Sequence, residues 1–475
     1  MGNKLEKILI PFFPHQIALK GMLLYFIALA SVSLIFIRYS MPTDFVVMGA
    51  VFVISFFGFA TFCSKKWNTV SKRNYLMFLF FIALLFRLIW VVFSFLYYTK
   101  KTGLPFEHDA ADAMGYHFEA VMLANGSWKN TIDYLFDSRE TFSDSGYVLY
   151  LSTLYRIIGP NIIVARIIKS ILGSLLCVLL YKLASRTFGE STGRMTGILA
   201  CFMPNLIIYC GLHLKETEML FLTVAFLERA DYLLRERKFT FVTVAVPFLL
   251  GLSLFTFRTV LGVAALFAFA TVIVFGDKER FNKRKRLVIG IYLAAALAMM
   301  AGGTLATEVE GYWNGRNENQ GMKREQQVSQ GYKWAKYATG TVMAPMMFVL
   351  PFPTMVDVEQ QYNQNVMHGG NYVRNFLGCF VLISLFNSIF VKKDWRDKLL
   401  PMSFMAAYLG IICMSGFANA ERFLLPGLPM LLLFSADGIA HLNAKNYGFV
   451  RIWYLVVPLM SFGWAFFKIG TRGLL

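Results

Sequence analysis

Residues 75–98 read YLMFLFFIALLFRLIWVVFSFLYY, and the one charged side chain among them is Arg87. An α-helix rises about 1.5 Å per residue, so a run of this length covers the roughly 30 Å of hydrocarbon in a bilayer. Backbone groups in lipid must hydrogen-bond within their own segment, and the run is therefore predicted to be a transmembrane helix. Arg87 lies near its middle, too deep to reach the head groups. We expect it to face other helices and to have a polar partner there.

Similar apolar stretches recur along the whole chain. Its 475 residues are 57% hydrophobic and 16% charged, with a mean hydropathy of +0.55. That is more apolar surface than one globular core can bury, so the predicted fold class is all-α, a polytopic bundle of transmembrane helices. About thirteen spans are predicted from hydropathy. They are residues 21–37, 44–63, 75–98, 162–183, 193–211, 214–233, 241–256, 259–275, 287–306, 374–391, 399–416, 423–441 and 450–467.

The net charge of +18 comes from short basic clusters between the apolar stretches. Such clusters are typical of cytoplasmic loops beside anionic membrane lipid, and we expect no nucleic acid partner. Placing the four most basic loops in the cytoplasm puts the hydrophilic segments 99–161 and 307–373 on the outer face. The chain is thus predicted to be a multi-pass protein of the inner (cytoplasmic) membrane, with its site facing the periplasm or exterior. The four basic loops are residues 65–73, 235–238, 278–286 and 392–398.

The outer segment 99–161 is predicted to be a structured cap. Its residues 146–158 (GYVLYLSTLYRII) are apolar but too short and too polar to cross a bilayer, which favours an interfacial helix. The chain then divides into four parts: an N-terminal cytoplasmic segment with two extra spans, a core that includes this cap, a second outer loop, and C-terminal spans. These parts are residues 1–74, 75–306, 307–373 and 374–475.

An acidic motif opens the first outer segment. In HDAADAMGYH, Asp109 and Asp112 are three residues apart and share one face if helical, where they can supply a general base or hold a divalent cation. Acidic residues are also favoured at the start of any solvated helix, and that alternative stays open. Tyr116 follows Asp112 by one helical turn and can help to position it. His108 completes the candidates in this motif.

Further polar residues lie at predicted outer ends of spans. Lys215, Glu216 and Glu218 occupy the turn between two spans, and Arg258 and Arg422 each lie where the chain emerges at the outer face. An arginine there can snorkel to the head groups, or it can hold a phosphate through two parallel hydrogen bonds. Two arginines and two aspartates on one face fit a site that holds a phosphorylated lipid beside a base.

The cysteines and histidines show no metal-ligand pattern. All six cysteines lie within or at the ends of apolar stretches without CxxC spacing, and the six histidines lack zinc-site spacing. We therefore expect neither disulfides nor a zinc site.

Taken in order, these residues resemble the GT-C superfamily of membrane glycosyltransferases, in particular family 39 and its aminoarabinose-transferase-like branch. In that family an Asp-Glu-x-x-Tyr motif opens the first outer loop, and DAMGY (112–116) is similar to it, with Ala120 and Gly126 following. The family's glutamate is Ala113 here, which leaves open whether Asp109 takes over part of its role.

The resemblance covers residues 75–442. Residues 146–189 look like the family's interfacial helix and second core span, and Pro204 stands where the family carries a proline within a span. Arg258 and Arg422 match the later landmarks. The implied fold is a GT-C-like bundle whose outer loops carry interfacial helices.

The resemblance also implies a function. The donor is a polyprenyl-phosphate-linked sugar that enters from the membrane lipids, and the acceptor is a hydroxyl of a glycan, lipid or protein. Asp112, or else Asp109, is the implied catalytic carboxylate, and Arg258, Arg422 and Lys215 bind the donor phosphate. Inversion at the anomeric carbon is expected. No cofactor is required, although Mg²⁺ or Mn²⁺ can take part. Two alternatives stay open: an O-antigen-type polymerase or ligase, and a transporter or flippase of lipid-linked glycans.

Overall fold

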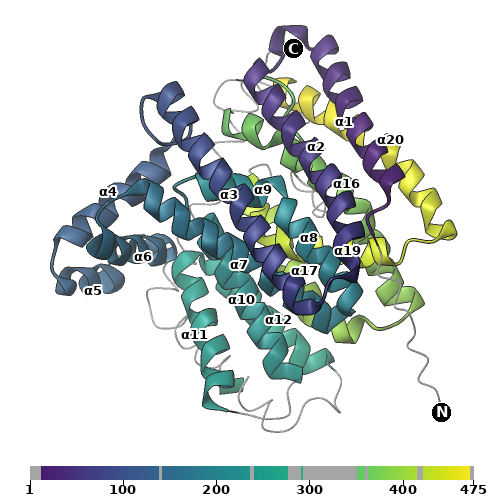
Figure 1. Cartoon of the computed structure of the whole chain (residues 1–475). Coiled ribbons are helices and arrows are strands. Elements are labelled where there is room, and N and C mark those ends of the chain that lie inside the picture. The colour runs from purple at the N-terminus through teal and green to yellow at the C-terminus, as the bar shows by residue number, and fades with distance from the viewer. Residues whose placement is uncertain are drawn as a thin grey trace.

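The described part of the chain is helical, as predicted (Figure 1). One isolated β-bridge, between Ser40 and Val356, is present there. The computed structural model describes residues 12–137, 142–235, 240–276, 290–291, 349, 351–358, 362–414 and 421–470.

Seven helical segments in this part are long and apolar enough to cross a membrane, or eight if a bent pair forms one span. These segments support the predicted polytopic membrane protein, whereas the full number of about thirteen spans stays a prediction. The seven segments are α1 (His15–Ile35), α2 (Thr43–Lys66), α3 (Lys72–Thr102), α7 (Ile162–Phe188), α16 with the turn after it (Tyr362–Val391), α18 with α19 (Glu421–Ala440), and α20 (Lys445–Gly470, its helix beginning at Ala444).

The remaining predicted spans differ in length or composition. α10 (Glu216–Arg235) carries several charged residues, and α11 (Phe241–Phe257), α12 (Thr259–Phe275) and α17 (Leu399–Met414) are shorter apolar helices. Whether these four cross the membrane stays a prediction. The span predicted at 287–306 lies outside the described residues apart from 290–291.

The bent pair consists of α8 (Glu190–Phe202) and α9 (Pro204–Ile208), which meet at 55°. Pro204 has no backbone N–H, so the carbonyl of Ala200 lacks its helical donor. Arg87 supplies donors there: Nη2 lies 3.4 Å from Ala200 O and Nη1 lies 3.3 Å from Cys201 O. The predicted inward orientation of Arg87 is confirmed, because its side chain is fully buried. Its partners include these freed carbonyls.

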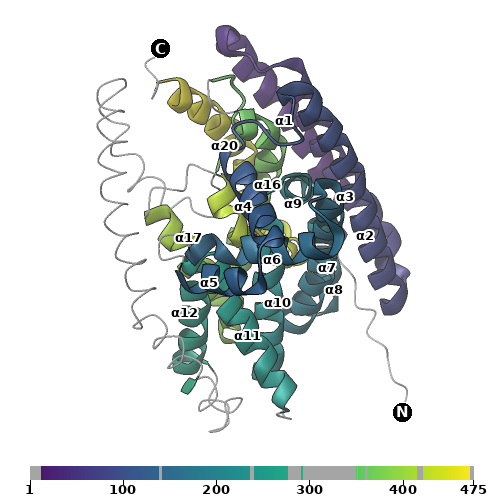
Figure 2. The same cartoon turned by 90° about the vertical axis from the view of Figure 1, so that its left-hand side faces the viewer.

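The first outer segment forms three helices, α4 (Ala111–Asn125), α5 (Trp128–Asp137) and α6 (Phe142–Ile158). They lie together at one side of the bundle, and α6 packs against both α4 and α11 (Figures 1 and 2). The prediction of a structured cap is therefore confirmed, whereas an interfacial position for it stays a prediction.

At two boundaries of the predicted outer segments the chain is helical. α3 continues to Thr102 and ends at Gly103, whose φ of 80° is the left-handed conformation that glycine adopts readily. Residues 362–373 form the first turns of α16 instead of a loop. Most of the predicted second outer loop, including residues 307–348, lies outside the described residues.

Two of the predicted cytoplasmic loops meet at one end of the bundle. Arg235, at the end of α10, donates to the carbonyl of Asp397 at 2.7 Å. Arg194, near the start of α8, donates to Trp67 O at 2.9 Å and Val70 O at 2.8 Å, just before α3. This grouping agrees with basic loops on a common face. Which face is cytoplasmic stays a prediction.

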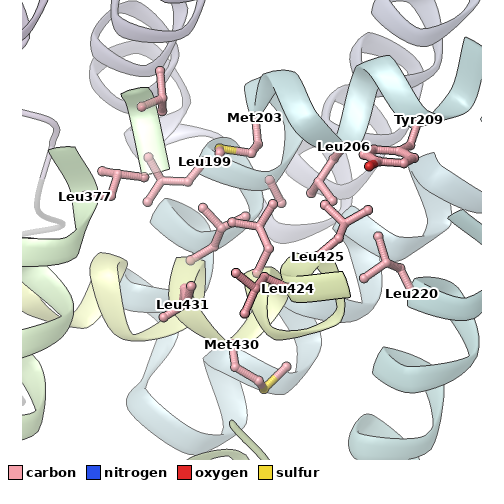
Figure 3. Packing of buried hydrophobic residues seen from close by; sticks show 14 of the residues in the cluster. Leu199, Met203, Leu206, Tyr209, Leu220, Leu377, Leu424, Leu425, Met430 and Leu431 are labelled. Carbon is pink, nitrogen blue, oxygen red and sulfur yellow. The ribbon is translucent and has the colours of Figure 1, made fainter. Parts of the chain in front are cut away.

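The core lies where α8 and α9 meet α18 and α19, with α10 and α16 alongside (Figure 3). Its side chains are almost wholly buried, so the packing holds the start of α10 and the start of α18 in place. The labelled residues are Leu199, Met203, Leu206, Tyr209, Leu220, Leu377, Leu424, Leu425, Met430 and Leu431.

Candidate active site

Three elements bring a carboxylate, a guanidinium and a second carboxylate together. Asp112 lies in the first turn of α4, Glu216 begins α10, and Arg422 is the second residue of α18. Arg422 Nη1 lies 2.6 Å from Asp112 Oδ2, and its Nε lies 3.4 Å from Glu216 Oε1. The Asp112 side chain is 50% exposed and that of Glu216 is fully buried. This ion-pair network therefore opens to solvent at Asp112.

Arg258 joins the network from the junction of α11 and α12. Its Nη2 lies 4.0 Å from Glu216 Oε1, and its Nη1 donates to the Tyr408 hydroxyl at 3.4 Å. The Phe423 ring centroid lies 4.9 Å from Arg258 Cζ and 5.3 Å from Arg422 Cζ. One aromatic ring thus contacts both guanidinium groups, which favours their charged forms and holds them near each other.

Lys215 is paired with a carboxylate that sequence reasoning missed. It forms an ion pair with Asp144, in the first turn of α6, and donates to the carbonyl of Phe257 at 2.8 Å. Tyr116, which was expected to help position Asp112, donates instead to Asp144 Oδ2 at 3.1 Å. Burial raises the pKa of Tyr116, and nearby Glu216 adds to the rise. The hydroxyl thus stays a protonated donor to Asp144.

The cations and carboxylates of this site balance one another. An added phosphate must therefore compete with a carboxylate already in place, and Asp112 is the more exposed partner of Arg422. The cations are Arg422, Arg258 and Lys215, and the carboxylates are Asp112, Glu216 and Asp144.

Three of the candidate residues lie apart from these ion pairs. Asp109 precedes α4 in a turn with φ of 52° and is exposed, so the expected shared helix face with Asp112 was wrong. His108 packs against the rings of Tyr98 and Tyr362, and burial lowers its pKa. Glu218 is the third of these residues.

Glu218 turns toward a different cation. Its Oε2 lies 3.5 Å from the Nζ of Lys169, which also donates to the carbonyl of Leu212 at 2.9 Å. Both side chains are buried, so this pair belongs to the interior below the cap. This pairing was not predictable from the sequence, because Lys169 lies within an apolar span.

A second polar group that sequence reasoning missed lies within the bundle. Glu421 Oε1 accepts from Asn205 Nδ2 at 2.6 Å, and its Oε2 accepts from the Tyr209 hydroxyl at 2.9 Å. Asn205 also donates to Asn371 Oδ1 at 3.1 Å. Arg374, buried one turn further along α16, has no hydrogen-bond partner for Nε or Nη2.

No group of three or more histidine, cysteine, aspartate or glutamate side chains that could hold a metal ion occurs in the part of the chain that the structure describes. A role for Mg²⁺ or Mn²⁺ stays a prediction. No protein-family model matches the chain, and no curated protein matches its sequence. The site itself and the resemblance carried by its motifs are therefore what indicate a function.

Proposed function

We propose that this chain is a membrane glycosyltransferase. It transfers a sugar from a polyprenyl-phosphate-linked donor to an acceptor hydroxyl at the outer face of the inner membrane. The observation that supports this most is the contact between Arg422 and Asp112, with Glu216 behind them. A guanidinium, which suits phosphate, and a carboxylate, which can accept a proton, meet beside a bundle of long apolar helices.

In this proposal Arg422 and Arg258 bind the donor phosphate. Guanidinium groups match phosphate oxygens with parallel hydrogen bonds, and Phe423 keeps the two groups together. Glu216, buried between them, holds both side chains in position before the donor arrives. The polyprenyl chain remains in the bilayer, so the donor reaches the site without leaving the lipid.

Asp112 is the proposed base. The acceptor oxygen attacks the anomeric carbon, and a new C–O bond forms as the bond from that carbon to the phosphate oxygen breaks. The bonding electrons leave with the phosphate, and the hydroxyl proton passes to Asp112. The arginines stabilise the charge that develops on the leaving phosphate. A single displacement of this kind inverts the anomeric carbon.

The ion pair sets an order for these events. While Arg422 is bound to Asp112, the carboxylate is occupied and the guanidinium is only partly available. When the donor phosphate takes over Arg422, Asp112 is released toward the acceptor. Donor binding therefore prepares the base.

A competing proposal is transport of a lipid-linked glycan, and one observation favours it. Polar groups continue into the bundle beyond the candidate site, at Glu421, Asn205 and Arg374, where a transporter would need them. A polymerase or ligase would use the same chemistry with a lipid-linked glycan as acceptor.

Reconstitution in proteoliposomes separates these functions. Membrane lipid extract supplies the acceptor, and mass spectrometry follows a polyprenyl-phosphate hexose as donor. A transferase gives an acceptor that is heavier by one sugar, together with free polyprenyl phosphate. Movement of the intact donor between leaflets without such a product would support the transporter and contradict the transferase.

A further inference from the structure

A second group of buried polar residues lies between the cap and the bundle. We call Glu107, Arg166 and His213 the polar cluster. Glu107 lies between α3 and α4, Arg166 lies near the start of α7, and His213 lies just before α10. Their exposed fractions are 4%, 0% and 1%. The ion pairs of the candidate active site include none of them.

Glu107 and Arg166 each have buried polar atoms without a hydrogen-bond partner. Arg166 Nη2 donates to the carbonyl of Pro105 at 2.5 Å, but its Nε and Nη1 have no partner, and neither has Glu107 Oε2. Burial raises the pKa of Glu107, and the charge of Arg166 opposes that rise, so the two groups are within electrostatic reach. The structure places no ion pair of 4.0 Å or less between these two described residues. Buried charged groups that lack a compensating partner destabilise the folded protein.

His213 adds a further free atom. Its Nε2 lies 3.1 Å from the Tyr155 hydroxyl, which lies 2.9 Å from Nδ1 of His117, whereas His213 Nδ1 has no partner. Burial lowers the pKa of His213 well below its usual range, so its ring is neutral and offers one donor and one acceptor. The ring of Phe106 lies 6.0 Å away.

The polar cluster is close to the candidate active site. The ring centroids of Tyr147 and Tyr116 are 5.2 Å apart, and Tyr116 holds Asp144. Lys169 donates to the Tyr147 hydroxyl at 3.3 Å, and its charge adds to the lowering of the pKa of His213 that burial causes. Tyr147 therefore links the two groups, because its ring centroid also lies 6.4 Å from that of His213.

We propose that Glu107, Arg166 and His213 form a subsite for the hydroxyl groups of a sugar ring. A hydroxyl both donates and accepts, so one group can accept from Arg166 and donate to Glu107. A phosphate would satisfy Arg166 but would set two negative groups together, and an ammonium would do the reverse. The proposal rests on the proposed function, and the sugar belongs either to the donor or to the acceptor glycan.

The test compares two ligands in the full-length protein: a polyprenyl-phosphate hexose and bare polyprenyl phosphate. The variants are Glu107→Gln, Arg166→Gln and the double variant, which leaves no uncompensated buried charge if a single change unfolds the region. Glu119→Gln is the matched control, because Glu119 accepts from Tyr134 within the cap and lies outside the polar cluster.

If the donor sugar occupies the subsite, the ratio of the affinities for the hexose-bearing and the bare lipid falls about tenfold in the variants, and the affinity for the bare lipid is unchanged. If the acceptor glycan does, the acceptor KM rises by about tenfold instead. Unchanged values for both would make the polar cluster a hydration site and overturn the proposal, as would weaker binding of the bare lipid in Arg166→Gln. A hexose preference that the unaltered protein shows and the variants lose, with no sugar transfer by the unaltered protein, would contradict the proposed function alone.

Discussion

Arg422 and Asp112 form an ion pair of 2.6 Å between Nη1 and Oδ2, which joins the first turn of α4 to the start of α18. Glu216 lies behind Arg422 and is fully buried, so the guanidinium is held from the protein side and is exchangeable on the solvent side. A site built in this way can give up Asp112 for a phosphate without losing the position of Arg422.

Replacing either arginine by lysine is expected to weaken donor binding. Lysine keeps the charge but loses the paired hydrogen bonds, so Arg422→Lys and Arg258→Lys should raise the Kd for bare polyprenyl phosphate by about tenfold. Arg258→Lys also loses the bond to Tyr408. Arg38→Lys, at an exposed position, is the control. Equal affinity in all three variants would leave both arginines as head-group anchors.

Asp144 is predicted to be a positioning residue. Asp144→Asn removes the charge opposite Lys215 and weakens the acceptor of the Tyr116 hydroxyl. We expect turnover to fall between about 10-fold and 100-fold while the Kd of the donor changes little. Tyr116→Phe should lower turnover in the same direction but less. Asp133→Asn, exposed on α5, serves as control, and a loss of donor binding equal to the loss of turnover would argue against positioning.

The orientation of the chain can be read from cysteine labelling. The six native cysteines are all buried, so single exposed cysteines report their own position. Lys129→Cys on α5 should react with a membrane-impermeant maleimide in intact cells, and Lys393→Cys, in a predicted cytoplasmic loop, should react only after lysis. The opposite pattern would invert the predicted orientation.

Arg87 is predicted to stabilise the break between α8 and α9. Arg87→Met leaves the carbonyls of Ala200 and Cys201 without these donors, which should lower the free energy of unfolding in detergent by roughly 1–3 kcal/mol. Adding Pro204→Ala restores a backbone N–H and should recover part of that loss. Adding Pro458→Ala instead, in α20, measures what removal of a proline does in general. Equal melting of Arg87→Met and the unaltered protein would contradict this role.

Several features of the fold follow from the sequence because each depends on one short segment. Apolar runs predict the long helices, and the position of Arg87 in the middle of its run predicts its burial. The cap was predictable because residues 146–158 are too polar for a span. The shorter helices show the limit of this reasoning, since α11 and α12 have apolar runs similar to the others but fewer residues.

The candidate site was less predictable because it depends on pairs far apart in the chain. Asp144 is an ordinary acid at the start of a helix until Lys215 and Tyr116 are placed beside it. Asp109 lies outside α4, which begins at Ala111. Sequence signals locate the start of a helix only to within one or two residues. Glu421 on α18 and Arg374 on α16 come within electrostatic reach of each other only through packing of separate helices.

The most direct measurement is the rate of sugar transfer by Asp112→Asn and Asp109→Asn, with donor affinity measured in the same membranes at matched expression. Asp112→Asn should lower turnover by about 10²- to 10⁴-fold, the contribution of a general base. It should keep donor affinity or improve it, because Arg422 is then free of its carboxylate partner. Asp109→Asn, exposed and outside the ion pairs, should cost no more than about tenfold. Loss of transfer in Asp109→Asn with near-normal turnover in Asp112→Asn would contradict the account, and full activity in both would remove this site from the reaction.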